Sequence, residues 1–269
     1  MSAKQTSHTP SDCYVFCIAN QKGGVGKTTT AINLATALSQ LKKKVLLIDL
    51  DPQGNATMGS GIDKNNCEHS VYQVLIGEKT VQEARQRSET GGYDVLCANR
   101  HLSGAEIDLV EMDSRELRLK NCLAPVLSEY DFILIDCPPT LSLLTLNGLA
   151  SAHGVIIPMQ CEYFALEGLS DLVNTIKRVY RNINPELQLI GLLRVMFDRR
   201  VTLQQQVSEQ IKQHFGDRVF ETAIPRNVRL AEAPSHGMPG VIYDKKSRGA
   251  KAYVKFGAEL VQRLSAKQT

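Results

Sequence analysis

At 269 residues the chain is long enough for one large domain or two small ones. Its 43% hydrophobic and 22% charged residues are typical of a soluble globular protein, and its net charge of +3 does not exclude a local patch that binds nucleic acid. The polar start of the chain excludes a signal peptide, and no apolar run approaches the roughly 20 residues of a membrane helix. We therefore expect a cytoplasmic protein whose residues 1–12 form a short mobile tail.

The cysteine pattern argues against a disulfide framework or a zinc site. The chain has seven cysteines, an odd number, and none of them forms a Cys-x-x-Cys pair. Several lie in apolar runs, where a thiol packs as a small hydrophobic group. This usage is typical of a reducing cytosol.

Apolar segments with strand composition alternate with segments of helical periodicity. The strand candidates are 13–19, 44–49, 93–98, 131–136, 154–159 and 187–196, and the helix candidates are 28–41, 166–180, 202–214 and 248–264. Most strand candidates are apolar on both faces, as expected when helices cover both sides of a sheet. The alternation predicts an α/β fold with a mainly parallel twisted sheet, formed by a single domain over 13–269. The less regular stretch 52–92 should hold surface loops and short helices.

The segment QKGGVGKTT, residues 21–29, has the setting of a phosphate-binding loop, because it follows a strand and opens a helix. Its glycines let backbone N–H groups surround an anion, and the helix adds its positive end. Lys27 would then reach the β- and γ-phosphates and Thr28 would bind Mg²⁺. The usual G-x-x-x-x-G-K-[ST] pattern expects glycine where Gln21 stands, and Lys22 is an additional charge. The alternative is a glycine turn with a solvated lysine.

Aspartates end two of the predicted strands, where α/β sheets place their ligand sites. Asp49 and Asp51 follow one strand, and Asp51, just beyond it, would orient an attacking water, although a solvated surface turn is equally consistent with this segment. Asp136 ends another strand and would bind Mg²⁺ through a water, unless it only caps the next segment. We interpret the neighbouring Cys137 as a packed thiol.

Together these segments resemble one known family. KGGVGKTT, DLDPQGNAT, DCPP, PMQCEYFALEGL and IPRNVRLAEAPSHGMP are similar to the ParA/Soj family of partition ATPases, in the larger group that includes MinD and the nitrogenase iron protein. The resemblance runs from about residue 13 to 265. It is greatest for the Soj-like branch without a large N-terminal DNA-binding extension, since about a dozen residues precede the first strand.

The resemblance implies a P-loop NTPase fold with a deviant loop, K-G-G-x-x-K-[ST], that begins at Lys22 and needs no earlier glycine. Lys22 would reach the partner's ATP across a two-fold dimer, Thr29 would contact the α-phosphate, and Asp51 would support hydrolysis. Pro225–Asn227 would line the adenine, although a solvated Arg226 after a strand is the alternative. The implied nucleotide contacts are Lys22, Gly23, Gly24, Val25, Gly26, Lys27, Thr28, Thr29, Pro225, Arg226 and Asn227.

The resemblance also implies salt-sensitive, sequence-independent DNA binding by the ATP-bound dimer. Arg200 and Arg229 match two DNA-contacting arginines, and nearby basic residues would widen the patch. The family shows Asp-x-Arg-Thr, whereas this chain has Asp198-Arg199-Arg200-Val201, so either Arg199 or Arg200 would face DNA. The alternative for all of them is a solvated face. The additional basic residues are Lys245, Lys246, Arg248 and Lys251.

The resulting hypothesis is a Mg²⁺-dependent ATPase, associated with the nucleoid, whose hydrolysis a ParB-type partner stimulates during chromosome or plasmid segregation. The main alternative is a MinD-like ATPase on a membrane, which would need a basic amphipathic C-terminal helix on lipid. The last helix candidate has an apolar stripe, but the same stripe would dock that helix on the sheet. A metal-cluster ATPase would need bridging cysteines that this chain lacks. Other cargo, such as large protein assemblies, is also consistent with the sequence.

Overall fold

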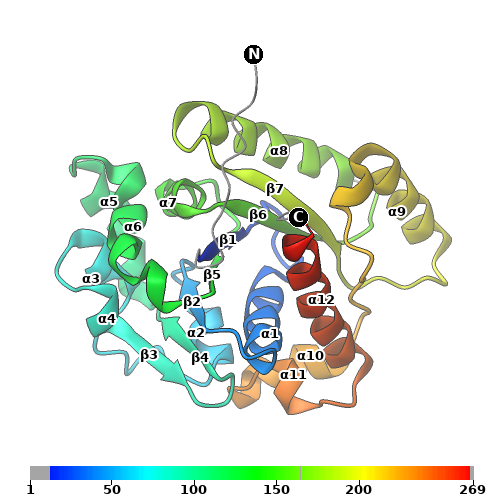
Figure 1. Ribbon diagram of the computed structural model, residues 1–269, viewed down its shortest axis with the longest axis horizontal. Helices are drawn as coiled ribbons and strands as arrows, with labels where there is room; N and C mark the ends of the chain where they lie inside the picture. The colour runs from blue at the N-terminus through cyan, green and yellow to red at the C-terminus, as the bar shows by residue number, and fades with distance from the viewer. Residues whose placement is uncertain (1–12, 164, 267–269) are drawn as a thin grey trace.

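The computed structural model describes residues 13–163 and 165–266. These residues contain one seven-stranded sheet in the order β3-β4-β2-β5-β1-β6-β7, parallel throughout except for the antiparallel pair β3–β4 (Figure 1). The predicted α/β fold is therefore confirmed, while the proposed tail at 1–12 lies outside the described residues. The strands are β1 (Tyr14–Ile18), β2 (Val45–Asp49), β3 (Arg85–Ser88), β4 (Tyr93–Leu96), β5 (Phe132–Asp136), β6 (Gly154–Met159) and β7 (Gln188–Arg194).

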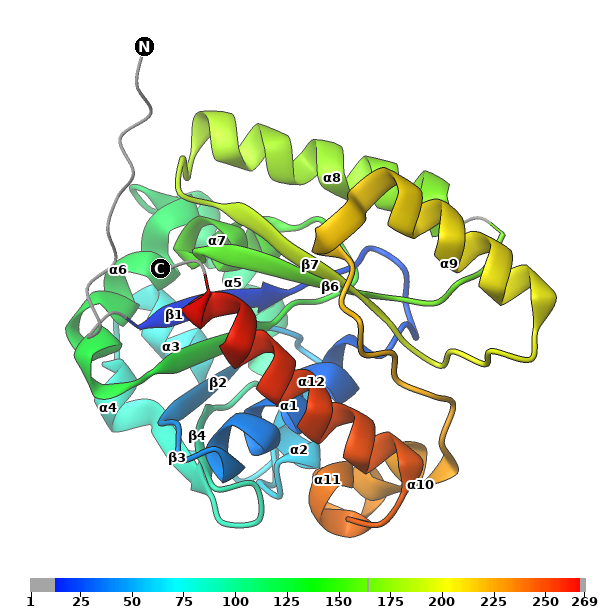
Figure 2. The same cartoon turned by 45° about the vertical axis from the view of Figure 1, so that its right-hand side comes forward.

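Helices cover both faces of the sheet (Figure 2). The α-helices are α1 (Lys27–Gln40), α2 (Asn55–Gly59), α3 (Val71–Ile76), α4 (Val81–Ala84), α5 (Ala105–Val110), α6 (Arg118–Leu123), α7 (Leu143–Ser151), α8 (Ala165–Asn182), α9 (Thr202–Phe215), α10 (Val228–Glu232), α11 (Gly240–Tyr243) and α12 (Arg248–Ser265). The 3₁₀ turns are η1 (Arg100–Gly104), η2 (Arg115–Leu117), η3 (Ala124–Glu129), η4 (Gly216–Arg218) and η5 (Ala233–His236).

The central strands are buried on both faces, which explains their continuous apolar sequences. In β1, Val15 and Cys17 join the core beneath α3 to α9, whereas Phe16 and Ile18 join the core beneath α1 and α10 to α12. Each side chain points to the face opposite that of its neighbour, so a strand covered on both sides must be apolar throughout. This two-sided burial fixes the carboxyl ends of the strands, where the predicted site lies.

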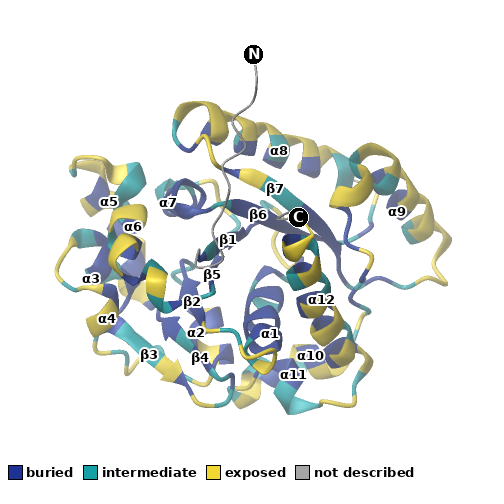
Figure 3. Cartoon of the chain, in the orientation of Figure 1, coloured by how far each residue is buried: buried dark blue, intermediate teal, exposed yellow. Residues whose placement is uncertain are grey.

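Helix α1 is buried nearly all round, because it lies between the sheet and α12 (Figure 3). The Thr30 and Tyr253 hydroxyls share a 3.0 Å hydrogen bond across the two helices, so the buried polar groups are satisfied. A Cβ at Gly257 would come within 3.0 Å of the Ala37 Cβ, and glycine therefore allows the close helix approach. The helix that follows the phosphate loop is thus held rigidly from both sides.

The apolar stripe of the last helix docks onto the core. Tyr253, Phe256 and Leu260 of α12 are buried, and the Phe256 ring meets Phe220 edge-on at 4.8 Å between centroids. The Arg263 guanidinium lies over the Phe220 ring, 4.6 Å from its centre. The stripe is consequently not available to a lipid surface. Among the described residues, no helix has the length and hydropathy needed to cross a membrane.

The stretch 52–92 is more regular than the sequence analysis expected. It contains the short helices anticipated there, and capping boxes start two of them, Ser70 with Gln73 at α3 and Thr80 with Glu83 at α4. It also contains β3, which the sequence analysis missed. The segment RQRS is polar because this edge strand pairs only with β4 and remains half-exposed, so it lacks the apolar signal of the inner strands.

We predict that Phe256→Ala lowers the free energy of unfolding by about 3–5 kcal/mol, because it removes a fully buried ring that packs against Phe220. Phe256→Leu should cost less, since it keeps much of the volume. Urea unfolding followed by circular dichroism measures both. The control is Val254→Ala on the exposed side of the same helix, which should change stability by no more than about 0.5 kcal/mol. Equal losses for Phe256→Ala and Val254→Ala would contradict the docking of α12.

Candidate active site

Three adjacent strands bring the predicted site residues together at one edge of the sheet. β5 lies between β1 and β2, and its terminal Asp136 is in register with Ile18 on one side and Asp49 on the other. Parallel strands end at the same edge, so the loop after β1, the acidic turn after β2 and Asp136 converge there. The sequence predicted each piece separately, and the strand order makes them one site.

The phosphate loop has an open, anion-binding conformation. Gly24 and Gly26 have φ values of +71° and +76°, in the left-handed region that side chains rarely adopt. Gly26 is also the N-cap of α1, and no side chain caps the first N–H groups of this helix. A Cβ placed at Gly23 or Gly24 would meet no heavy atom within 4 Å, so the loop is open on that side. These free N–H groups at a helix start fit a phosphate.

Lys27 provides a buried cation beneath this loop. Lys27 is only 7% exposed, and its Nζ donates to the Lys22 carbonyl oxygen at 3.2 Å. Desolvation lowers the pKa of Lys27, and the nearby Asp136 and Asp51 carboxylates oppose this shift. The ammonium of Lys27 is therefore already held beside the loop. An incoming polyphosphate would replace the Lys22 carbonyl as its partner.

Asp136 is the residue whose surroundings best fit a bound cation. The residue is fully buried, and neither carboxylate oxygen has a hydrogen-bond partner among the described residues. Burial raises its pKa well above the ordinary value, as does Asp49, while Thr28 and Lys27 lower it in part. A buried carboxylate that Thr28 and Lys27 compensate only in part is costly, and a divalent cation would compensate it further. With the Thr28 hydroxyl beside it, Asp136 fits Mg²⁺ bound mostly by water and phosphate.

The two aspartates after β2 have different surroundings. Asp49 is fully buried and accepts hydrogen bonds from the Thr57 backbone and hydroxyl, both at 2.8 Å, and from the Asp51 N–H at 3.1 Å. Burial nevertheless raises its pKa to about 6. Asp51 is half-buried, and its Oδ1 accepts only a local bond from Gln53. Asp49 thus holds the turn, whereas Asp51 remains near Lys27 with capacity to bind a water.

The segment Pro225–Asn227 lies at the same edge of the sheet, just after a strand-like extension beside β7. Ile224 donates to the Arg194 carbonyl and accepts from Phe197, which fixes the approach to Pro225. The Asn227 side chain caps α10 by accepting from the Arg229 N–H at 2.8 Å. Arg226 is exposed. The segment is therefore positioned by backbone contacts, and its assignment to adenine remains a prediction.

The proposed DNA residues are exposed, and carboxylates hold two of them. The Arg200 guanidinium makes a two-point contact with Asp198, at 3.0 and 2.7 Å, which lowers the pKa of Asp198 to about 2. Arg229 pairs with Glu232 at 2.9 Å and approaches Asp244 at 3.7 Å. Asp244 begins the turn that carries Lys245 and Lys246. The positive charge of Arg248 also contributes to the lowered pKa of Asp198. Arg199 is exposed beside Arg200.

Glu162 belongs to this site, although the sequence analysis did not select it. The Lys22 Nζ forms an ion pair with Glu162 Oε2 at 2.5 Å. Glu162 stands in the predicted family segment PMQCEYFALEGL, but an acidic residue before a helix gives no signal of a lysine 140 positions away. Only the adjacency of β1 and β6 brings them together.

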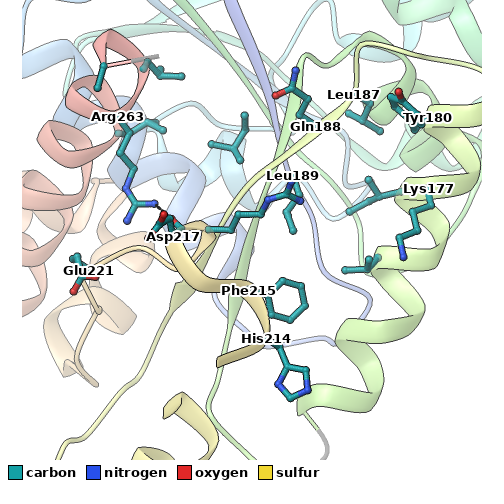
Figure 4. A pocket seen from close by; sticks show the side chains of 17 residues that line it. Lys177, Tyr180, Leu187, Gln188, Leu189, His214, Phe215, Asp217, Glu221 and Arg263 are labelled. Carbon is teal, nitrogen blue, oxygen red and sulfur yellow. Dashed lines mark hydrogen bonds between the residues drawn. The ribbon is translucent and has the colours of Figure 1, made fainter. Parts of the chain in front are cut away.

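A large cavity lies apart from the site. It has a volume of about 1150 Å³ and is lined by α8, the start of β7, η4 and the end of α12, with Leu189, Phe215 and Arg263 among its walls (Figure 4). The start of β7 is at the opposite edge of the parallel sheet from the phosphate loop. Among the described residues, no group of three or more His, Cys, Asp or Glu side chains is placed so that it could hold a metal ion.

The fold and the site define a P-loop ATPase: a glycine loop at the start of a helix, a buried lysine beneath it and a buried carboxylate that requires a cation. A family model described as "AAA domain" matches residues 13–189. The chain is 50% identical over 246 residues to the sporulation initiation inhibitor Soj of Bacillus subtilis, covering 91% of this chain and 97% of Soj. It is 49% identical over 253 residues to the chromosome partitioning protein ParA of Myxococcus xanthus, covering 94% and 89%. The chain belongs to the ParA/Soj family of partition ATPases.

A solved structure supports the nucleotide site. A Mycobacterium smegmatis protein described as cobyrinic acid a,c-diamide synthase, with ADP and magnesium bound, is 38% identical to this chain and has a TM-score of 0.84, covering 95% of this chain and 96% of that one. The reaction named for that protein differs from partition, so the similarity concerns the fold and the nucleotide site alone. ATP and Mg²⁺ are accordingly the cofactors that the site fits.

We predict that Asp136→Asn lowers Mg²⁺-dependent ATP hydrolysis roughly 10²-fold and stabilises the nucleotide-free protein by about 1–3 kcal/mol at pH 7. The folded-state pKa of Asp136 is raised. Between pH 3.8, the ordinary pKa, and this raised value, the folded form therefore binds more protons than the unfolded form. The wild type should therefore lose stability as the pH rises through this window, and the gain of the variant should vanish below about pH 4.

Urea unfolding across pH and a phosphate-release assay make these measurements. The exposed Asp113→Asn is the control for the removal of one charge and should change neither quantity. Asp136→Asn with unchanged hydrolysis would exclude Asp136 from the magnesium site.

Proposed function

We propose that the protein is a partition ATPase whose ATP-bound dimer binds DNA without sequence preference and segregates a chromosome or plasmid. The observation that carries the proposal is the phosphate loop with two lysines in different settings. Lys27 is buried beneath its own loop, whereas Lys22 extends away from it with a side chain 56% exposed. A second, exposed lysine on such a loop suits a nucleotide bound by another protomer.

Within one protomer the chain's own residues would bind and orient the nucleotide. The loop N–H groups and Lys27 would hold the phosphates, and Thr29 would contact the α-phosphate. Bound Mg²⁺ would neutralise charge on the phosphates, held by Thr28 and Asp136. Asp51 would orient the attacking water, because it is the carboxylate near Lys27 that is not occupied in holding the turn.

Across the dimer, Lys22 would act on the partner's nucleotide. A cation supplied in trans stabilises negative charge that develops during phosphoryl transfer, as an arginine finger does. The dimer would then form with ATP and separate after hydrolysis, so that the nucleotide sets the population of the DNA-binding form. Relatives named ParA and Soj support the role in chromosome partition, and a ParB-type partner would accelerate hydrolysis.

The DNA-binding face would include the loop before α9 and the turn before α12. Asp198 pairs with Arg200 and is also influenced by Arg248, which supports placing these two segments on one face. Lys245 and Lys246 extend it, and Arg229 is joined to the same turn through Asp244. Nucleoid association would follow from this surface rather than from the net charge of +3.

We predict that Lys22→Ala retains ATP binding by the monomer, within about threefold, but loses the ATP-dependent dimer and nearly all hydrolysis. Lys27 remains to bind the phosphates, whereas the contact in trans is removed. Analytical ultracentrifugation with ATP, with titration of a fluorescent ATP analogue, measures the two steps. The control is Lys42→Ala, which changes an exposed lysine in the turn after α1. If the Lys22→Ala variant still dimerises and hydrolyses ATP, Lys22 is only a solvated side chain without a role in trans.

We predict that Asp51→Ala binds ATP but hydrolyses it slowly, and therefore stays on DNA in a salt-sensitive complex. In this background Arg200→Ala should weaken DNA binding more than Arg199→Ala, because the loss of Arg200 also leaves the Asp198 carboxylate uncompensated on the same face. Each lost phosphate contact should reduce the slope of log affinity against log salt by about one.

Fluorescence anisotropy with two unrelated duplexes measures the affinities. Arg181→Ala, exposed at the end of α8, is the matched control. Absence of DNA binding in every nucleotide state would exclude the proposed DNA-binding face.

A further inference from the structure

The end of β6 and the residues that follow it contact the phosphate loop and the residue before it at three points. The Asn20 amide donates to the Pro158 carbonyl at 2.8 Å, and the Gln160 amide donates to the Gly24 carbonyl at 3.1 Å. Glu162 forms the third contact, with Lys22 at 2.5 Å. Pro158, Gln160 and Glu162 thus contact residues between Asn20 and Gly24, so the end of β6 and the turn after it lie against the loop.

Only the third contact joins opposite charges. The Asn20 and Gln160 contacts are amide-to-carbonyl bonds, which hold the backbone of the loop without affecting its charge. The Glu162 carboxylate, in contrast, neutralises the Lys22 ammonium within its own protomer. Lys22 is held twice at its base, since its N–H donates to Asn20 at 3.0 Å and its carbonyl accepts from Lys27. The free part of the residue is therefore the side chain, and Glu162 determines where it points.

Glu162 and a nucleotide phosphate would compete for the same ammonium. Both are anionic, and a phosphate drawn to Lys22 while Glu162 remains in contact would face a like charge a few ångströms away. Lys22 therefore has to leave Glu162 before its full charge can act on a phosphate. The exchange is possible because both side chains are about half exposed, 56% for Lys22 and 47% for Glu162, so neither is locked by packing.

We propose that Glu162 is a positioning residue that holds Lys22 on its own protomer and so raises the ATP concentration at which the dimer forms. The inference rests on the proposed function of Lys22 across the dimer. In the free protomer Lys22 is paired in cis, and dimerisation exchanges Glu162 for the partner's phosphates. The contact thus disfavours dimers at low ATP without preventing nucleotide binding, which Lys27 and the loop N–H groups provide.

The exposure of the pair sets the size of the effect. An exposed ion pair changes an equilibrium by about 1.4- to 5-fold. A two-fold dimer breaks two such pairs, so removal of the Glu162 charge should lower the dimer dissociation constant by the square of this factor, about 2- to 30-fold. Because salt screens an exposed pair, the difference should shrink at high ionic strength.

The test compares wild type, Glu162→Gln and Glu162→Asp, with Glu167→Gln as the control for loss of one negative charge nearby. Glu167 is exposed in the first turn of α8, and no ion pair involving it is found among the described residues. Sedimentation velocity with the non-hydrolysable analogue AMPPNP gives the dimer dissociation constant at about 0.05 M and about 0.5 M salt. Binding of a fluorescent ATP analogue to dilute monomer is measured in parallel.

We expect Glu162→Gln to dimerise 2- to 30-fold more tightly at low salt and to approach wild type at high salt, with monomer nucleotide binding unchanged within about twofold. Glu162→Asp should restore wild-type behaviour, because the flexible lysine can follow a carboxylate one methylene shorter. In the nucleotide-free protein, an amine-reactive reagent should label Lys22 faster in Glu162→Gln than in wild type.

Two results would overturn the proposal while leaving the proposed function intact. One is a Glu162→Gln dimer no tighter than wild type when wild type dimerises with AMPPNP. The other is a gain that Glu167→Gln shares or that is independent of salt, since either would indicate a general charge or structural effect. If the wild type never dimerises, the proposed function itself is contradicted. The proposed effect of Glu162 on dimer assembly then fails as well.

Discussion

The structure depends on keeping opposite charges dehydrated at the ends of three neighbouring strands. Asp136 and Asp49 are fully buried there, and Lys27 is nearly so. Burial of charge is unfavourable, and only a rigid surrounding prevents these groups from moving into water. The apolar cores on both faces of the sheet provide this rigidity. The unsatisfied Asp136 carboxylate is the remaining cost, and it makes the nucleotide-free protein a preformed site for a cation.

Side chains of the same type have different roles in the site. Asp49 satisfies the backbone of the acidic turn, which leaves Asp51 available to a water. Lys27 is buried for use within the protomer, whereas Lys22 is exposed and held by Glu162. In each pair, the buried member acts within the site of its own protomer, and the more exposed member is available to a water or to another protomer.

The sequence predicted most of the fold because the strands are buried on both faces and the helices are amphipathic. The predicted strand and helix bounds agree with the structure to within about two residues. The phosphate loop could also be recognised, since its glycines and lysines are local in sequence. Strand β3 was missed because an edge strand needs no apolar face. The capping-box residues at Ser70 and Thr80, which the sequence analysis did not use, could have marked the two helices before it. Glu162 was missed because its partner is remote in sequence.

The sequence by itself therefore determined the fold class, the phosphate loop and the candidate carboxylates, since local patterns of polarity and glycine encode them. Only the tertiary structure decided which carboxylate holds the turn, that Thr28 and Lys27 compensate the buried Asp136 only in part, and that Lys22 pairs with Glu162. These properties arise from the order of the strands and the depth of burial. The order of strands brings together residues more than a hundred positions apart, and burial decides which of their charges must be paired.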